Sequence, residues 1–168
     1  MDATIREPAE ILLVDEDPIA LASAVTALDS AGHVVYQAPD RISALRIARA
    51  EALDLVICDV SVGGDCGLEL SRELRRLPGM QDVPVMFISR TQLPDIVRRS
   101  HEAGAAYYLR KPLDPEVLID LVGKALWLPH LVQTRLAMHQ PSQSAVPPPR
   151  KKTGARTAAI QGIRLPLA

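Results

Sequence analysis

The sequence contains few aromatic residues, no long apolar run and no recognisable leader. Phe, Trp and Tyr supply only 3% of the 168 residues, so a core must be built from Leu, Val, Ile and Ala. No run approaches the roughly 18 apolar residues that a membrane helix needs, and no membrane span is expected. The N-terminus lacks the basic-then-apolar order of a secretory signal. With 48% hydrophobic and 23% charged residues, the composition is typical of a soluble globular protein, which we expect to be cytoplasmic.

Cysteine is also scarce. Cys58 and Cys66 are the only two, and their spacing matches neither a metal finger nor a disulfide framework. Reduced thiols in the cytoplasm are the simplest interpretation. The four histidines show no metal-ligand spacing either, and we expect them to be solvated.

The net charge of −1 hides an uneven distribution. Residues 141–168 hold five of the 19 basic residues and none of the 20 acidic ones, so they carry +5 and residues 1–140 carry −6. A disordered, solubilising end is the simplest interpretation of this basic segment. Two alternatives are open: weak contact with nucleic acid or anionic membrane, and folding back onto the acidic body.

Short apolar runs alternate with helical patterns through the first 129 residues. Several runs are apolar on consecutive positions, as in strands buried on both faces of a parallel sheet. Asp17 and Asp40 are candidate N-caps, and Pro18 suits the first position of a helix. The expected strands are 10–14, 33–37, 54–58, 83–88 and 105–109; the expected helices are one from 18 that ends at Gly32, then 41–51, 68–77, 96–103 and one from 115. This strict alternation predicts the α/β class, with a doubly wound five-stranded parallel sheet and helices on both faces.

We expect one domain over residues 8–129. Leu128–Pro129 should end or kink the last helix, because proline cannot complete the helical hydrogen bonds. Residues 130–140 are a possible helical extension, and residues 141–168, with prolines at 147–149, are expected to form a disordered basic tail. Too few residues follow the domain for a helix-turn-helix effector. Neither an output domain nor specific DNA binding is therefore expected.

Polar residues stand where four of the expected strands end. Asp15 and Glu16 follow the first strand, Asp59 the third, Ser89 the fourth and Lys111 the fifth. In a doubly wound sheet, ligands bind beyond the carboxyl ends of the strands, so these side chains should meet at one edge. Their chemistry suits phosphorylation of a carboxylate, since a hard cation such as Mg²⁺, or Mn²⁺ in its place, takes oxygen ligands. Lys111 can supply a second positive charge, and Ser89 can donate a hydrogen bond to a phosphate oxygen.

The sequence resembles a response-regulator receiver domain of the chemotaxis-regulator type. Four segments carry the resemblance, in this order: Ile11-Leu-Leu-Val-Asp-Glu-Asp-Pro18, Asp54-Leu-Val-Ile-Cys-Asp59, Val85-Met-Phe-Ile-Ser89 and Gly104-Ala-Ala-Tyr-Tyr-Leu-Arg-Lys-Pro112. It implies a flavodoxin-like fold in which Asp59 is the phosphoacceptor, with a sensor histidine kinase or a histidine phosphotransfer protein as donor. Such a domain belongs to bacterial two-component signalling and is a switch rather than an enzyme. It catalyses only its own aspartyl phosphorylation and dephosphorylation.

The resemblance also implies how the metal is held. Asp15, Glu16 and Asp59 would bind it together with the backbone carbonyl of Ser61. Output would pass through contact with an unknown downstream protein, and phosphorylation-dependent dimerisation is possible.

A second group of residues would read the phosphate. Lys111 would contact it, and Ser89 would be the hydroxyl that follows it. Tyr108 would be the aromatic residue that turns inward when that hydroxyl moves. The bond between Lys111 and Pro112 is cis in the family.

The sequence departs from the family pattern in two places. The loop after Asp59 usually carries Met-Pro, but here it is Val62-Gly63-Gly64, and the Asp that often precedes its final Gly is Cys66. We expect these changes to make the loop more mobile, since Gly costs more entropy to order than Pro. Arg90 follows Ser89 where a small residue is usual. It could shield the phosphate or add a charge that holds it, and we expect slow turnover of the phosphorylated form.

Two other functions fit parts of this pattern. A receiver-like docking module would keep the fold and not be phosphorylated, because the altered loop and Arg90 make it inert. A haloacid-dehalogenase-type phosphohydrolase would also use an aspartate nucleophile with Mg²⁺. That class would want a second Asp two residues after the nucleophile, where this sequence has Ser61, so it is disfavoured.

Overall fold

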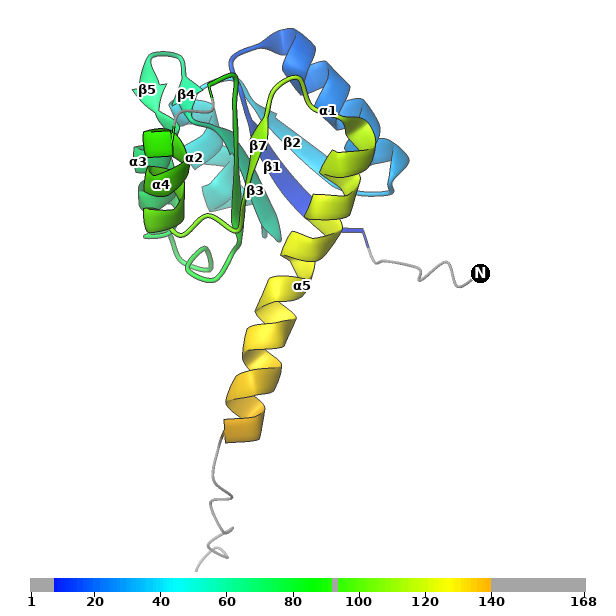
Figure 1. Cartoon of the computed structure of the whole chain (residues 1–168), viewed down its shortest axis with the longest axis vertical. Helices are drawn as coiled ribbons and strands as arrows, with labels where there is room; N and C mark the ends of the chain where they lie inside the picture. The colour runs from blue at the N-terminus through cyan, green and yellow to red at the C-terminus, as the bar shows by residue number, and fades with distance from the viewer. Residues whose placement is uncertain (1–7, 92–93, 140–168) are drawn as a thin grey trace, which may run out of the picture.

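A five-stranded parallel sheet forms the centre of the molecule (Figure 1). The computed structural model describes residues 8–91 and 94–139, with side chains as far as residue 129. The strand order is β2-β1-β3-β6-β7, and every neighbouring pair is parallel. The strands are β1 (Glu10–Val14), β2 (Val34–Ala38), β3 (Leu55–Asp59), β6 (Val85–Ser89) and β7 (Tyr107–Arg110). The predicted doubly wound parallel α/β fold is confirmed.

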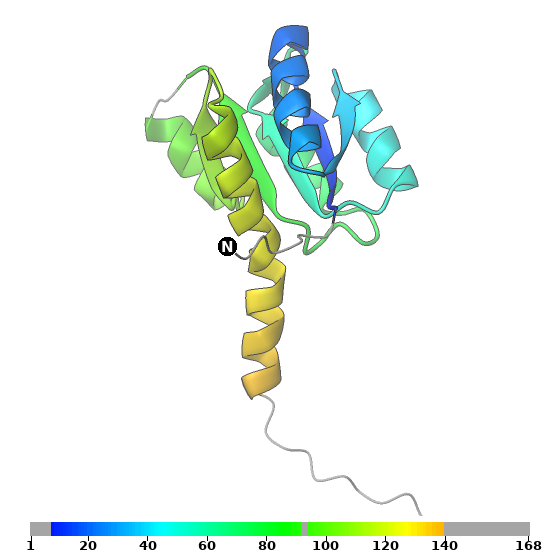
Figure 2. The same cartoon turned by 90° about the vertical axis from the view of Figure 1, so that its right-hand side faces the viewer.

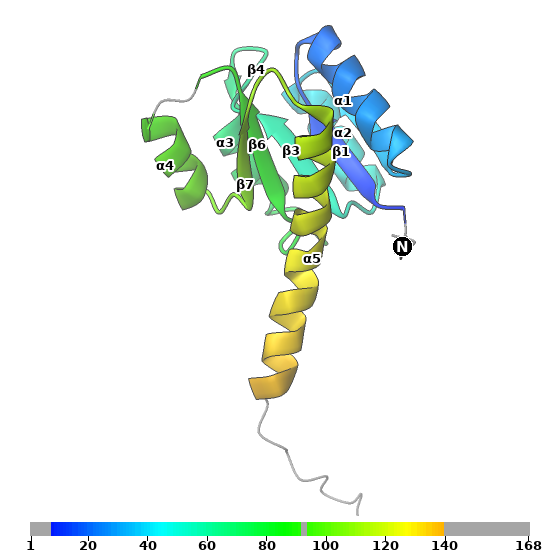
Figure 3. The same cartoon turned by 45° about the vertical axis from the view of Figure 1, so that its right-hand side comes forward.

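Helices cover both faces of this sheet. α1 (Pro18–Ser30) and α5 (Pro115–His139) pack side by side on one face, as Figure 2 shows. α2 (Arg41–Ala50), α3 (Gly67–Leu74) and α4 (Pro94–Glu102) lie on the other (Figure 3). Residues of β3 and β6 alternate between two apolar clusters, one under each layer of helices. The alternation explains the consecutive apolar positions, because both faces of these central strands are buried.

Asp side chains cap the first two helices of the chain. Asp17 accepts hydrogen bonds from the N–H groups of Ile19 and Ala20, and Pro18 occupies the first turn of α1. Asp40 caps α2 in the same way by accepting from Ser43. The side chain thereby satisfies N–H groups that have no partner within the helix. The two N-caps predicted from the sequence are confirmed.

The loop after β3 contains an element that the sequence did not predict. It forms a small hairpin of β4 (Ser61–Val62) and β5 (Asp65–Cys66). Gly63 and Gly64 form its turn with φ values of 59° and 85°. Two-residue hairpin turns of this kind need positive φ at both positions, which glycine adopts without a Cβ clash. The two glycines therefore supply the backbone conformation of this turn, and the mobility expected of the loop stays a prediction.

The last helix is longer than predicted. α5 does not end at Leu128–Pro129 but continues through Pro129 to His139, and its second half projects beyond the sheet (Figure 2). An interior proline removes one helical hydrogen bond at a cost of about 3 kcal/mol, but the residues that follow are mostly good helix formers. The extension expected over 130–140 is thus continuous with α5. The tail expected over 141–168 lies outside the described residues, among which no helix is long and apolar enough to span a membrane.

Candidate functional site

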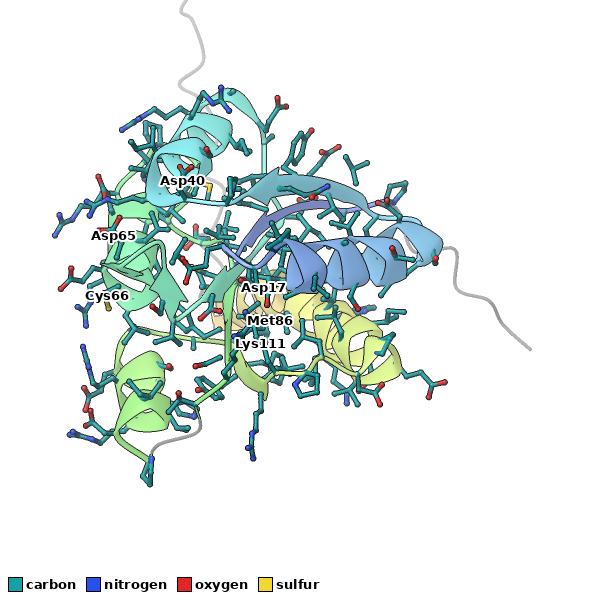
Figure 4. The ribbon with its side chains drawn as sticks, turned by 90° about the horizontal axis from the view of Figure 1, so that it is seen from above. Asp17, Asp40, Asp65, Cys66, Met86 and Lys111 are labelled. Carbon is teal, nitrogen blue, oxygen red and sulfur yellow. The ribbon has the colours of Figure 1, made fainter. Side chains whose placement is uncertain are left out.

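Four strand ends deliver polar side chains to the same edge of the sheet. Asp59 and Ser89 are the last residues of β3 and β6, while Asp15 and Lys111 directly follow β1 and β7. Parallel pairing places these ends together, and the Lys111 N–H donates to the Ser89 carbonyl at 2.8 Å. Figure 4 looks onto this edge, with Lys111 near its centre. The residues line a cavity of about 240 Å³, here called the Asp59 cavity; its full lining is Asp15, Glu16, Asp17, Asp59, Ser61, Ser89, Arg90, Thr91 and Lys111.

A buried lysine joins two buried carboxylates in this cavity. The Lys111 Nζ lies 2.5 Å from Asp59 Oδ2 and also forms an ion pair with Asp15 Oδ2. Asp15, Asp59 and Lys111 are only 1%, 7% and 8% exposed. Burial lowers the pKa of Lys111, but its hydrogen bonds to the two carboxylates and their negative charges outweigh this, so the net pKa is raised. The ammonium therefore stays charged at neutral pH and holds the two acids together.

Backbone N–H groups donate to the second oxygen, Oδ1, of each of these two carboxylates. Asp15 Oδ1 accepts from the N–H of Asp17, and Asp59 Oδ1 accepts from the N–H of Ser61, both at 2.9 Å. Asp15 Oδ2 is buried, and its partner within the described part of the chain is the Lys111 ammonium. A carboxylate oxygen carries two lone pairs, so Oδ2 can contact Lys111 and still ligate a cation. The geometry thus leaves coordination capacity on Asp15.

The three carboxylates expected to bind the metal all line the Asp59 cavity, but Glu16 is held by the hairpin. Glu16 is exposed, and its Oε2 accepts from the N–H of Gly63 in the hairpin turn at 2.9 Å. Among residues 8–91 and 94–139, no three His, Cys, Asp or Glu side chains form a ready-made metal cluster. Mg²⁺ needs no such cluster, since it usually binds one or two carboxylates together with waters and phosphate. Asp15 and Asp59 fit that requirement and would hold the cation. Ser61 lines the cavity, and its carbonyl stays a predicted ligand.

Ser89 and Tyr108 meet at a residue that the sequence did not single out. Ser89 is buried, and its Oγ accepts from the N–H of Thr91 at 3.1 Å. The Tyr108 hydroxyl donates to the Thr91 carbonyl, while its ring packs against the apolar cluster that also contacts α2 and α3. Thr91 therefore links the two residues that were predicted to respond to phosphate. Their roles in a switch stay predictions.

Arg90 lies at the mouth of the Asp59 cavity and lines it. Its side chain is 72% exposed and forms an ion pair with Asp17 Oδ2, whose side chain is 23% exposed. The hydrogen bonds from the N–H groups of Ile19 and Ala20 lower the pKa of Asp17 by more than burial raises it, and the charge of Arg90 lowers it further. The sequence identified Asp17 only as a helix cap. Nothing in the sequence pairs two residues 73 positions apart.

The backbone beside Asp59 is tightly packed against the start of α3. The Gly67 N–H donates to the Val60 carbonyl at 2.8 Å, and a methyl group on Gly67 would overlap the backbone oxygen of Asp59. The buried Cys58 thiol donates to the same oxygen at 3.2 Å, and burial raises its pKa far above the ordinary value. Cys66 is the N-cap of α3 but makes no side-chain cap hydrogen bond. On the far side of the cavity, the Lys111–Pro112 peptide bond is cis.

Comparison with known proteins identifies the family. Residues 11–123 match the response regulator receiver domain, and the chain belongs to this family. Receiver domains are signalling modules of two-component systems rather than classical enzymes. Protein PilH of Pseudomonas aeruginosa is 30% identical over 119 residues, which cover 70% of this chain and 98% of PilH.

Solved structures show the same fold. Chemotaxis protein CheY4 of Vibrio cholerae matches with a TM-score of 0.67 and 25% identity over 70% of this chain and 98% of CheY4. A response regulator of Burkholderia pseudomallei with a phosphorylated aspartic acid, calcium ion and citrate matches with a TM-score of 0.63 and 25% identity, covering 79% of this chain and 75% of that one. Other curated relatives are much longer: the chain spans 15% of one and 27% of two others.

Proposed function

We propose that the protein accepts a phosphoryl group on Asp59 and signals through contact with another protein. One observation carries this proposal: the buried Lys111 ammonium bridges Asp59 and Asp15 in a cavity that opens at the carboxyl edge of the sheet. Two carboxylates and a lysine, all less than a tenth exposed, are costly to bury for stability alone. Buried clusters of charged groups beside a cavity are common at functional sites.

The residues suit transfer of a phosphoryl group to a carboxylate. A carboxylate oxygen of Asp59 forms a bond to phosphorus while the bond from phosphorus to the donor breaks, and the leaving group keeps that electron pair. Phosphoryl transfer asks the protein mainly for positioning and charge stabilisation. Lys111 supplies positive charge on one side of the phosphoryl group. A Mg²⁺ or Mn²⁺ ion would supply it on the other side, held by Asp15 and Asp59 and by Glu16 once its side chain leaves the N–H of Gly63. Water that later attacks phosphorus returns Asp59 to the free carboxylate and releases inorganic phosphate.

A phosphorylated Asp59 would offer the Ser89 hydroxyl a new acceptor. That hydroxyl now accepts from the N–H of Thr91, and its own O–H can donate to a phosphate oxygen; we expect the side chain to turn toward the phosphate to do so. The Thr91 backbone would then lose one of its two side-chain contacts, leaving only the bond from Tyr108. Movement of this segment would alter the surface beside β7 and α4. That surface is where we expect a downstream protein to bind, with phosphorylation-dependent dimerisation as one outcome.

Similar proteins support the proposal. The Burkholderia pseudomallei structure contains a phosphorylated aspartic acid and a divalent calcium ion, which is the chemistry proposed here for Asp59. PilH consists almost wholly of the matched region, so a receiver of this size can be a protein in its own right. Receiver domains interact with histidine kinases, and we propose a sensor histidine kinase or a histidine phosphotransfer protein as the phosphoryl donor.

Small acyl phosphates with Mg²⁺ test the proposal directly. Intact-mass measurement should show one added phosphoryl group, peptide mapping should place it on Asp59, and fluorescence of Trp127, the single tryptophan, should report any structural response. Asp59→Asn should abolish the modification. Asp65→Asn is the matched control, because Asp65 is exposed on the hairpin, away from Lys111 in Figure 4. A chain that no acyl phosphate and no histidine kinase modifies would contradict the proposal and favour a docking module that is not phosphorylated.

A further inference from the structure

An ion pair crosses the mouth of the Asp59 cavity. Asp17 stands just beyond the end of β1, and Arg90 directly follows β6. β3 lies between these two strands in the sheet and carries Asp59 at its end. A contact between Asp17 and Arg90 must therefore pass over the end of β3. Both residues line the cavity that contains Asp59.

A second cavity gives Arg90 room to move. It has a volume of about 480 Å³ and lies between the first turns of α1 and the segment after β7. Asp17, Arg90 and Lys111 line both cavities, so the ion pair stands at their boundary. The other lining residues, Ile19, Ala20, Ser23, Pro112 and Leu113, are mostly apolar and offer no competing charge. The guanidinium can leave Asp17 and swing aside without displacing packed side chains.

The same segment is tied to the residues expected to respond to phosphate. Arg90 lies between Ser89 and Thr91, which are joined by the hydrogen bond from the Thr91 N–H to the Ser89 hydroxyl. The Tyr108 hydroxyl holds the Thr91 carbonyl in place. From this segment the Arg90 side chain reaches Asp17, beyond the end of β1. A change at Ser89 would release one of these hydrogen bonds and loosen the ion pair.

We propose that the Asp17–Arg90 ion pair is a gate over Asp59 that slows the entry of small phosphoryl donors and of hydrolytic water. The gate rests on the proposed function, since it regulates access to the same carboxylate. Asp17 and Arg90 determine specificity in this proposal. They slow phosphorylation by phosphoryl donors that do not themselves separate Arg90 from Asp17.

The ion pair that forms the gate is weak. Arg90 is largely exposed, and exposed ion pairs hold their partners together only modestly. The population in which the ion pair is formed should exceed the population in which it is broken by about fivefold at most. Opening the gate permanently should therefore raise the rates of loading and of hydrolysis by about two- to fivefold.

A different role for Arg90 makes the opposite prediction for one variant. If Arg90 only held the phosphoryl group by its charge, removing Asp17 would free Arg90 and prolong the phosphorylated state, while removing Arg90 would shorten it. A gate predicts the same sign for both, because either change opens the mouth. The two roles are thus separated by the sign of the Asp17 effect.

The test uses Asp17→Asn, Arg90→Ala and the double variant in the full chain. Asn caps a helix as well as Asp, so Asp17→Asn keeps the start of α1 and removes only the charge. Arg98→Ala is the matched control, because Arg98 is also exposed and paired with acids, but on α4. The measurements are the rate of Asp59 loading by a small acyl phosphate with Mg²⁺ and the rate of loss of the phosphoryl group afterwards.

We expect both single variants to load and hydrolyse about two- to fivefold faster than wild type, with Arg98→Ala unchanged. The double variant should be no faster than either single one, because one gate can be opened only once. High salt should bring wild type toward the variants, since the screening length falls to roughly 3 Å at 1 M. Unchanged rates, or slower hydrolysis in Asp17→Asn, would overturn the gate. Absence of phosphate on Asp59 in every protein, variants included, would contradict the proposed function as well.

Discussion

Replacement of Gly67 by Ala tests how closely α3 approaches the phosphoacceptor strand. A methyl carbon added at this position would lie 2.9 Å from the carbonyl carbon of Asp59 and 3.1 Å from the Cys58 Sγ, and nearer still to the Asp59 oxygen. Real Cβ atoms essentially never come within 3.0 Å of such backbone atoms. The backbone of Gly67 has no positive φ, so the whole effect is steric.

The magnitude follows from what can move. Asp59 ends a strand that is buried along its entire length, so the start of α3 and the hairpin before it must shift instead. That shift would break the hydrogen bond from Gly67 to Val60 and loosen the packing of Leu68, which is buried at the start of α3. Overpacking of this kind costs about 1–3 kcal/mol, and the rigid backbone contact places Gly67→Ala at about 3 kcal/mol.

Urea unfolding measures this cost, and Gly64→Ala provides the control. Gly64 has a φ of 85° but no atom within 4 Å of an added methyl group, so its cost is backbone strain alone, about 1 kcal/mol. Gly67→Ala should also slow the loading of Asp59 by an acyl phosphate, because the displaced hairpin includes Ser61, whose N–H orients the Asp59 carboxylate. A free energy of unfolding that falls no further for Gly67→Ala than for Gly64→Ala would refute the argument from close approach.

Three further predictions concern buried groups. Lys111→Met should lower the free energy of unfolding at neutral pH by up to about 3 kcal/mol, because it leaves two buried carboxylates without their cation. Mg²⁺ should reduce this deficit, because a bound cation can take the place of the ammonium between the two carboxylates; a deficit that Mg²⁺ leaves unchanged in urea titrations would contradict this. In the native protein, a thiol reagent at neutral pH should label Cys66 but not Cys58, because burial raises the pKa of the Cys58 thiol. Rapid labelling of both cysteines would contradict the burial of Cys58. Ser89→Ala should speed exchange of the Thr91 amide hydrogen by about tenfold in NMR experiments, since its acceptor is removed; unchanged exchange would exclude that bond.

Much of the fold follows from local patterns. The central strands are apolar at consecutive positions because both faces are buried, and Asp17 and Asp40 cap helices through bonds to residues two or three positions away. Both signals are contained within a few residues. The convergence of Asp59, Ser89 and Lys111 also followed from the sequence, because parallel strands place their carboxyl ends at one edge.

Other features depend on residues that are distant in sequence. The sequence predicted three metal-binding carboxylates, but it could not show that Glu16 accepts from the N–H of Gly63, 47 positions away. It also did not predict the hairpin after Asp59, in which two glycines supply the positive φ values that a tight turn needs. Pro129 was expected to end or kink α5, but the loss of one hydrogen bond does not stop a helix whose following residues favour it.

The sequence by itself determined the class of fold, the edge of the sheet that carries the site and the residue types gathered there, because periodicity and strand ends are local properties of the chain. Only the tertiary structure decided which of those residues touch. It placed the Lys111 ammonium between Asp15 and Asp59, and it brought Arg90 across β3 to Asp17. Ion pairs of this kind depend on distances between separate strands, and these are set by the packing of the whole sheet rather than by any segment of the chain.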